Sequence, residues 1–229
     1  MNNKIILALD SNNLEEVIDI TKKIKNKVFT VKIGLEFFNS FGKEGVKKIN
    51  KLGITNLLLD LKLKDIPQTI YKAIKALDDI EFGFITIHGQ GGKKMLEKAG
   101  EACNEIHSKP KIMVVTILTA LNDNDLKIMG NNSSVIKQVE FLSKMAKNVN
   151  AGVICSGQEA KVVRKILGPG LPIFTPGIRM GNDNNNDQQR VCTPSESIKN
   201  GADKVIMGRS LIKGNIEENI DKVSNSIKD

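Results

Sequence analysis

The feature that most constrains the fold is an alternation of short apolar runs, rich in β-branched residues, with longer segments of helical periodicity. This alternation is typical of repeated βα units on a parallel sheet. Eight runs can be counted, and eight strands in βα alternation are enough to close a barrel. The predicted strands are Lys4–Leu9, Phe29–Ile33, Leu57–Lys62, Phe84–Ile87, Ile112–Leu118, Gly152–Cys155, Pro172–Thr175 and Lys204–Met207.

The segments between these runs are amphipathic and would cover the outside of the sheet as helices. Clear examples are Leu14–Ile24, Gly45–Leu52 and Ile66–Leu77. With 229 residues, 40% of them apolar and 26% charged, the chain has the length and composition of one globular α/β barrel. The sequence therefore predicts an α/β fold, a single-domain (β/α)₈ TIM barrel over residues 1–229.

A doubly wound open sheet is the competing architecture. It would normally carry a glycine-rich phosphate turn after its first strand. Here the first strand is followed by Asp10-Ser11, and the glycines that suit phosphate come late in the chain. Barrels commonly bind phosphate in the loops after strands seven and eight, so the placement favours the barrel.

The charge balance indicates a small anionic substrate more than a nucleic acid. The formal net charge is +8, from 34 basic and 26 acidic residues, and the excess is spread as single lysines and Lys-Lys pairs. One Tyr and no Trp leave little aromatic surface for stacking on bases. A diffuse positive field suits an anionic small molecule, and no nucleic-acid partner is expected.

Cysteine use and hydropathy predict a cytoplasmic protein that does not enter membranes. Cys103, Cys155 and Cys192 are odd in number, far apart and without Cys-x-x-Cys spacing, as expected of reduced thiols. No apolar run approaches the ~20 residues that span a bilayer.

The strongest motif is LLLDLKLKDIPQT, residues 57–69. Side chains alternate along a strand, so Asp60 and Lys62 should point to the same side, with Asp65 just beyond in the loop. A lysine flanked by two carboxylates in a cleft is held charged and in place, as a general acid should be. The alternative is an ion pair that only orders the loop.

Two more charges close predicted strands, Lys32 on the second and Asp10 on the first. A buried strand rarely tolerates a lysine without a carboxylate nearby. If both residues face the barrel mouth with Asp60, Lys62 and Asp65, the site combines alternating charges from three strands. The alternative is that each is a rim charge facing water.

Two turns near the C-terminus have the residues of a phosphate site. Thr175-Pro176-Gly177-Ile178-Arg179 follows the seventh strand and Gly208-Arg209-Ser210 follows the eighth. Glycines let backbone N–H groups approach phosphate oxygens, and each arginine offers two parallel donors. A single Gly-Arg pair would be an ordinary turn, so it is the pairing that predicts a phosphate cradle.

Several other residues are assigned simpler roles. His88 ends strand four without the partners of a metal site, which predicts a hydrogen-bonded core or rim histidine. Cys155-Ser156 is interpreted as packing. Thr119 could hydrogen-bond a heterocycle, or instead form a cap or turn. The polar segment 181–189 is predicted to be a mobile loop.

With these residues placed, the chain resembles the bacterial orotidine 5'-phosphate decarboxylases over essentially its full length. Asp-x-Lys-x-x-Asp-Ile-Pro is the most specific of the matching motifs, and their order along the chain adds to its weight. The motifs are LALD, VKIG, DLKLKDIPQT, GGKKM, TILT, TPGIRM, NDQQRVCTP and VIMGRSL.

The resemblance implies a homodimeric barrel that decarboxylates orotidine 5'-phosphate to uridine 5'-phosphate, in de novo pyrimidine biosynthesis, without metal or cofactor. Lys62 would protonate the pyrimidine carbon that loses carbon dioxide, with Asp60 beside the scissile carboxylate and Lys32 completing the charge network. Asp65 would reach into the neighbouring subunit's site, together with Ile66 and Thr69.

The resemblance also implies a set of substrate contacts. Asp10 and Lys32 would contact the ribose and Thr119 the pyrimidine edge, while Gln188 would bridge base and phosphate as its loop closes. The residues that match phosphate-binding positions are Arg179, Gly208 and Arg209. Two positions depart from the family pattern: Ala120, where relatives often carry Ser, and Lys64, where they often carry His. The change at Lys64 is expected to have no effect on function, because this residue points away from Asp60 and Lys62.

Two other functions compete with this reading. One is a metal-dependent sugar-phosphate decarboxylase or aldolase of the same superfamily, which would share the Asp-x-Lys-x-x-Asp motif. Those enzymes carry a metal-binding Glu where this chain has Lys32, and a cation there would repel magnesium. The other is a non-catalytic phosphate-binding barrel, against which the intact Asp60, Lys62 and Asp65 set argues.

Overall fold

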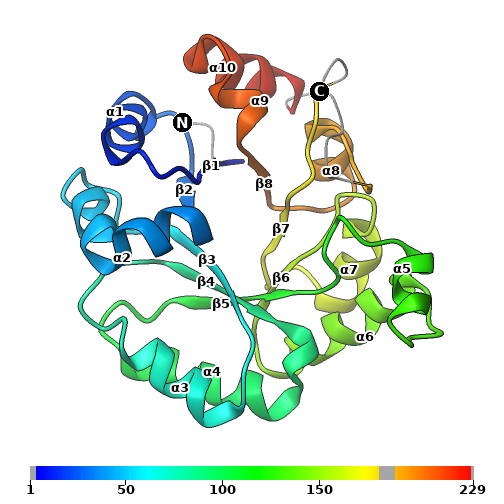
Figure 1. The fold of residues 1–229 in the computed structure, drawn as a ribbon. Helices are drawn as coiled ribbons and strands as arrows, with labels where there is room; N and C mark the ends of the chain where they lie inside the picture. Colours follow the sequence, from blue (N-terminus) through cyan, green and yellow to red (C-terminus); the bar gives the residue numbers. More distant parts are fainter. Residues whose placement is uncertain (1–3, 181–188, 228–229) are drawn as a thin grey trace.

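Eight parallel strands form a closed barrel in chain order in the computed structural model, which describes residues 4–180 and 189–227. Each predicted strand is confirmed, with ends that shift by a few residues. Figure 1 shows the strands at the centre and the helices around them. The strands are β1 (Ile5–Leu9), β2 (Thr30–Ile33), β3 (Leu58–Leu63), β4 (Phe84–His88), β5 (Lys111–Val115), β6 (Gly152–Ile154), β7 (Ile173–Thr175) and β8 (Lys204–Met207).

The helices follow the strands and cover the barrel (Figure 1). None of those within the described residues is long and apolar enough to cross a membrane. They are α1 (Leu14–Ile24), α2 (Leu35–Asn50), α3 (Pro67–Lys75), α4 (Lys93–Glu105), α5 (Asp123–Ile128), α6 (Val135–Asn148), α7 (Ala160–Leu167), α8 (Pro194–Lys199), α9 (Arg209–Ile212) and α10 (Ile216–Ser226), with a short 3₁₀ turn η1 (Gly89–Gly91) before α4.

Helix α2 is longer than the predicted Gly45–Leu52. It begins ten residues earlier, and it is kinked at Gly42, whose φ of 55° lies in the left-handed region. The kink breaks the helical period, so periodicity alone does not predict the first half of the helix. Phe37 in that first half is fully buried, so the early turns of α2 also pack against the barrel.

The core has two layers, as expected of a barrel filled with side chains. A large cluster lies between the strands and the surrounding helices, and a smaller one fills the inside of the barrel. Aromatic rings from Phe29, Phe84 and Phe174 pack together near the starts of the strands, with Phe84 and Phe174 centroids 5.0 Å apart. These rings close the interior of the barrel at this end, and (β/α)₈ barrels carry their ligand sites at the opposite end, where the strands finish.

The pairing of β3 with β4 contains an irregularity at the C-terminal end of the barrel. Leu59 pairs with Ile85 and Leu63 with Ile87, so three residues of β3 lie opposite one residue of β4. Lys62, inside this bulge, has a φ of 47°, which few residues other than glycine adopt. Bulges of this kind re-aim side chains and are common next to active sites.

Candidate active site

Three charged side chains from two adjacent strands meet where the barrel opens. The Asp60 carboxylate accepts from both lysines through the same oxygen, with Oδ2 at 3.0 Å from Lys32 Nζ and 2.9 Å from Lys62 Nζ. The side chains of Lys32 and Asp60 are 13% and 10% exposed, and that of Lys62 is 33% exposed. The structure thus brings together the charges that the sequence placed at the ends of strands two and three.

Asp60 is ionised in this setting. Burial alone would raise its pKa, but the charges and hydrogen bonds of Lys32 and Lys62 outweigh burial and lower the pKa to about 2. A carboxylate shared by two ammonium groups in a low-dielectric pocket also fixes where those groups sit. The three charges are therefore held in place before a ligand binds. Lys62, the more exposed of the two lysines, lines the cavity.

One residue of this cluster was missed by sequence reasoning. The Thr86 hydroxyl on β4 donates to Asp60 Oδ1 at 2.9 Å and accepts from the Lys62 backbone N–H at 2.8 Å. A threonine in an apolar strand gives no signal on its own. Its role depends on the β3–β4 register, which the sequence does not reveal.

The charged cluster forms one wall of a cavity of about 280 Å³. The other walls are largely apolar, as in most pockets that bind small molecules. Cys155 is one of the wall residues, and burial raises its pKa to about 12, which agrees with its predicted role in packing. The lining residues are Lys32, Asp60, Lys62, Val115, Ile117, Leu118, Thr119, Ala120, Ile154, Cys155, Pro176 and Ile206.

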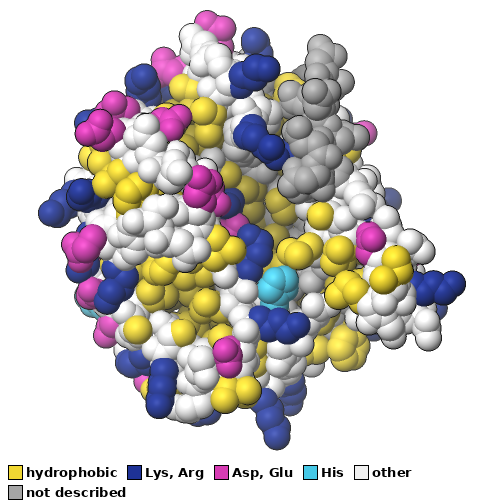
Figure 2. All heavy atoms as spheres, viewed as in Figure 1, with side chains coloured by type: hydrophobic (Ala, Val, Ile, Leu, Met, Phe, Trp, Pro, Cys, Tyr) yellow, Lys and Arg dark blue, Asp and Glu magenta, His cyan; other side chains and the backbone are white. Residues whose placement is uncertain are grey.

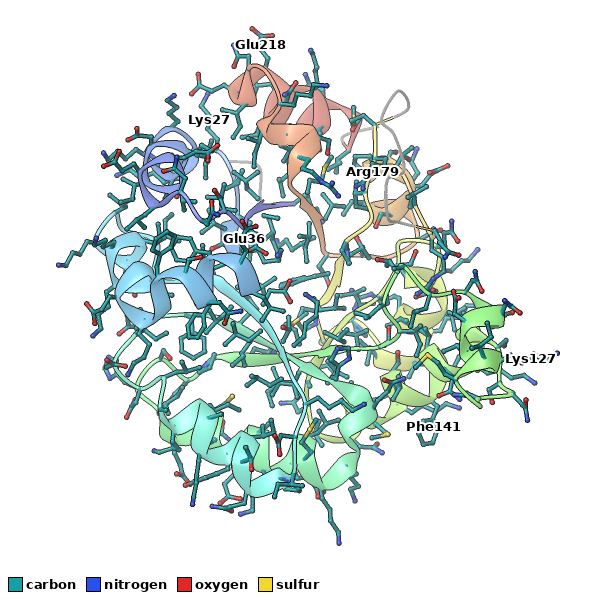
Figure 3. All side chains as sticks on the ribbon, in the orientation of Figure 1. Lys27, Glu36, Lys127, Phe141, Arg179 and Glu218 are labelled. Carbon is teal, nitrogen blue, oxygen red and sulfur yellow. The ribbon has the colours of Figure 1, made fainter. Side chains whose placement is uncertain are left out.

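A second, more polar cavity adjoins the first and shares Lys32, Pro176 and Ile206 with it, so the two form one elongated cleft. It contains both arginines predicted to bind phosphate, Arg179 and Arg209. Figure 2 shows Lys, Arg and hydrophobic side chains around this opening. In Figure 3, Arg179 and Glu36 are labelled on opposite sides of it. Asp10, Gly177 and Gly208 also line this part of the cleft.

Asp10 is held at the start of α2. Its Oδ1 accepts from the Phe37 backbone N–H at 2.9 Å, a favourable place for a carboxylate at a helix N-terminus. A Cβ on Gly34 would lie 2.2 Å from Asp10 Oδ2, so only glycine fits there. The VKIG motif thus serves two residues, since its lysine joins the Asp60 cluster and its glycine makes room for Asp10.

The turn after β7 places Arg179 in the cleft. Gly177 has a φ of 72°, which explains the glycine, and Ile178 forms a parallel bridge with Cys192. The Arg179 backbone N–H donates to the Cys192 carbonyl at 3.0 Å. Residues on both sides of the segment 181–188 are thereby tied together.

Thr119 lies in a segment that is held by Arg190, a contact that the sequence did not reveal. Arg190 donates to the carbonyls of Ile117 and Leu118 at 3.0 and 2.7 Å and forms a buried ion pair with Glu159. Its backbone N–H also donates to the Thr119 carbonyl. The predicted strand Ile112–Leu118 ends at Val115, and the carbonyls of Ile117 and Leu118 beyond it bond to Arg190 and not to a neighbouring strand.

Asp65 lies outside the Asp60 cluster. It is exposed, its Oδ1 accepts from the Ile66 backbone N–H, and among the described residues Lys62 pairs with Asp60 and not with Asp65. Within one chain, Asp60 is therefore the carboxylate that pairs with Lys62, and Asp65 does not complete the predicted pair of flanking carboxylates. Ile66 and Thr69 are exposed as well, with Ile66 at 67%. The role of these three residues in a neighbouring subunit's site stays a prediction.

Four other predicted positions can be placed or set aside. Gln188 lies outside the described residues. Lys64 is exposed, and Ala120 lines the first cavity. His88 is half-buried, and burial, reinforced by the charges of Lys64 and Lys62, lowers its pKa. Its Nδ1 has no hydrogen-bond partner among residues 4–180 and 189–227, which does not match the hydrogen-bonded histidine predicted.

Comparison with known families agrees with this geometry. Residues 3–220 match the model of the "Orotidine 5'-phosphate decarboxylase / HUMPS family". The chain belongs to this family. Over 218 residues it is 39% identical to the orotidine 5'-phosphate decarboxylase of Wolbachia sp. subsp. Brugia malayi, with 95% of each chain covered. It is 37% identical to that of Buchnera aphidicola subsp. Schizaphis graminum, with 91% of this chain and 88% of the relative covered.

A solved structure supports the same assignment. The fold superposes on the crystal structure of orotidine 5'-phosphate decarboxylase from Lactobacillus acidophilus with a TM-score of 0.84 and 32% identity. The match covers 99% of this chain and 100% of that one. The (β/α)₈ barrel is thus shared over the whole length.

The depressed pKa of Asp60 makes a testable contribution to stability. A carboxylate whose pKa falls from 3.8 to about 2 on folding stabilises the protein above pH 3.8, and this stabilisation is lost as the pH falls toward 2. We therefore expect the wild type to lose about 1 kcal/mol of unfolding free energy, relative to Asp60→Asn, when the pH falls from 6 to 3. Urea unfolding at both pH values measures it, and a difference independent of pH would contradict the ionised assignment.

Proposed function

We propose that this chain decarboxylates orotidine 5'-phosphate to uridine 5'-phosphate, a step of de novo pyrimidine biosynthesis, without a metal or cofactor. The observation that carries the proposal is one cleft with the Lys32–Asp60–Lys62 cluster at one end and Arg179 and Arg209 at the other. This arrangement suits a substrate with a reacting group at one end and a phosphate at the other. The family and its relatives agree with that substrate.

The chemistry needs a fixed positive charge. Loss of carbon dioxide leaves a carbanion in the plane of the pyrimidine ring, where the π-system cannot delocalise it, so the barrier falls mainly through preorganised charge. Lys62 supplies an ammonium group that stabilises this carbanion and then gives it a proton. Asp60 holds Lys62 in place at 2.9 Å, and Lys32 balances the charge of the carboxylate by contacting the same oxygen at 3.0 Å.

The phosphate end supplies binding energy away from the reacting carbon. Arg179 and Arg209 offer charged donors, and the backbone at Gly177 and Gly208 lets a phosphate approach. Binding energy from a remote group is used to orient the reacting end of a substrate. We further assign the ribose to Asp10 and Lys32, the pyrimidine edge to Thr119, and a bridging role to Gln188.

We also propose a homodimer in which Asp65, Ile66 and Thr69 complete the partner's site. The support is an apolar surface next to these residues. Ile128, Met129 and Phe141 are 76%, 64% and 59% exposed. Met129 and Phe141 share a surface depression with Lys64, the residue before Asp65. Hydrophobic side chains are visible over α5 and α6 in Figure 2, and Figure 3 labels Phe141 at the edge of the molecule. An exposed patch of this kind marks an interface.

The metal-dependent sugar-phosphate reaction is less well supported. In this chain the Asp60 carboxylate is already neutralised by two ammonium groups, and a magnesium ion would have to displace both.

A cytoplasmic location is proposed from the cysteines, because Cys103, Cys155 and Cys192 are all buried free thiols.

Replacing the proton donor should abolish turnover but not binding. We expect Lys62→Ala to lower kcat by at least about 100-fold, since it removes the general acid and the charge at the carbanion. Loss of ultraviolet absorbance by orotidine 5'-phosphate in the presence of a chelator measures turnover, and calorimetry with uridine 5'-phosphate measures binding. Lys64→Ala is the matched control and should stay near wild type. Near wild-type turnover by Lys62→Ala would refute the assignment.

Removing one phosphate contact should act on affinity. We expect Arg209→Ala to raise KM for orotidine 5'-phosphate about 10- to 100-fold, because a charge-assisted contact to a phosphate is lost. Lys213→Ala removes the same charge from an exposed position that does not line the cleft and should change KM little. Steady-state kinetics measure KM for both variants. A KM of Arg209→Ala equal to that of Lys213→Ala would rule out the phosphate cradle.

Shared sites can be tested by mixing variants. If Asp65 acts across a dimer, heterodimers of Lys62→Ala and Asp65→Ala contain one intact site each. Statistical mixing should therefore recover about a quarter of the wild-type activity. Mixing Lys62→Ala with Asp60→Ala is the control and should recover none, because both residues belong to the same site. No recovery in the first mixture, with heterodimers demonstrated by mass, would count against sharing.

A further inference from the structure

Thr86 lies in β4 behind the Asp60 cluster, 1% exposed, and it does not line either cavity of the cleft. It cannot touch a substrate there. We infer that Thr86 is a positioning residue, whose hydroxyl fixes both the Asp60 carboxylate and the backbone that carries Lys62. The inference rests on the proposed function, because it assigns Thr86 its effect through the proton donor of that reaction.

The direction of both hydrogen bonds is determined by the chemistry of the groups. A backbone N–H can only donate, so the Thr86 hydroxyl must accept from Lys62 N at 2.8 Å. Its single proton is then available for Asp60 Oδ1 at 2.9 Å, which must accept. Asp60 thus binds Thr86 through Oδ1 and the two ammonium groups through Oδ2. Rotation of the carboxylate would break bonds on both oxygens.

The same hydroxyl satisfies the irregular backbone of β3. Thr86 is the single β4 residue opposite the three residues between Leu59 and Leu63. The left-handed conformation at Lys62 is costly for a residue other than glycine and persists only where its surroundings hold it. An unpaired buried N–H would add a further cost. Thr86 gives that N–H a partner, and so stabilises the bulge that aims the Lys62 side chain at the cavity.

The position requires a hydroxyl and not just a residue of this size. Valine has nearly the same shape as threonine but can neither donate nor accept, whereas serine keeps the hydroxyl and loses only a methyl group. Misplacing a reacting group by 1 Å can cost about 100-fold in rate. Loss of the hydroxyl should therefore lower the rate of the chemical step and leave remote phosphate binding intact.

The test compares Thr86→Val, Thr86→Ser and a control, Thr30→Val. Thr30 is also a buried strand threonine, 2% exposed, but its hydroxyl donates to Asn56 O at 2.7 Å near the plugged end of the barrel. We expect Thr86→Val to lower kcat about 10- to 100-fold with KM within about threefold of the wild type. Thr86→Ser should restore kcat to within about threefold, and Thr30→Val should leave it unchanged within that range.

A second readout does not depend on activity. Amide hydrogen exchange measured by NMR should show the Lys62 N–H protected in the wild type and in Thr86→Ser, and exposed to exchange in Thr86→Val. If Thr86→Val does not fold, the wild type and Thr86→Ser are compared instead. A protected Lys62 amide together with a near wild-type kcat in Thr86→Ser supports the positioning role of the Thr86 hydroxyl. An unprotected Lys62 amide in the wild type overturns it.

The outcomes separate this inference from the proposed function. Folded Thr86→Val with kcat within about twofold of the wild type would overturn the positioning role while decarboxylation stands. A wild-type protein that does not consume orotidine 5'-phosphate would overturn the proposed function. In that case amide exchange still decides whether Thr86 holds the backbone at Lys62.

Discussion

The structure depends on one carboxylate oxygen that is shared by two ammonium groups. Asp60 Oδ2 lies about equally far from Lys32 and Lys62, and the pair of positive charges keeps the carboxyl ionised despite its burial. Taking three charges out of water is costly unless each is paired and hydrogen-bonded. Thr86 donates to Oδ1, so both oxygens of the Asp60 carboxylate are bonded before any ligand arrives.

The barrel divides the work of the site among its strands. The ends of β2 and β3 carry the charged cluster, the segment after β5 carries Thr119, and the turns after β7 and β8 carry the two arginines. Because parallel strands of a closed barrel all end on one side, groups distant in sequence meet in one cleft. The opposite end is filled by aromatic rings and supports the fold rather than the chemistry.

Much of this could be predicted from the sequence, for physical reasons. Buried parallel strands are continuous apolar runs, so all eight were visible, and charges that end such runs pointed to the site at Lys32 and Asp60. What the sequence could not reveal depends on contacts between distant elements. The bulge at Lys62, the role of Thr86 and the Arg190–Glu159 pair all follow from strand register or loop packing. Asp65 lies beyond the end of β3, as predicted, and within one chain it does not join the Asp60 cluster.

A crystal structure of the protein with uridine 5'-phosphate bound would test the role of Lys62 directly. We predict that the phosphate lies between Arg179 and Arg209 and that Lys62 Nζ lies about 3 to 3.5 Å from the ring carbon that the carboxyl group leaves. A nucleotide bound in the reverse direction, or a ring carbon beyond the reach of Lys62, would contradict it.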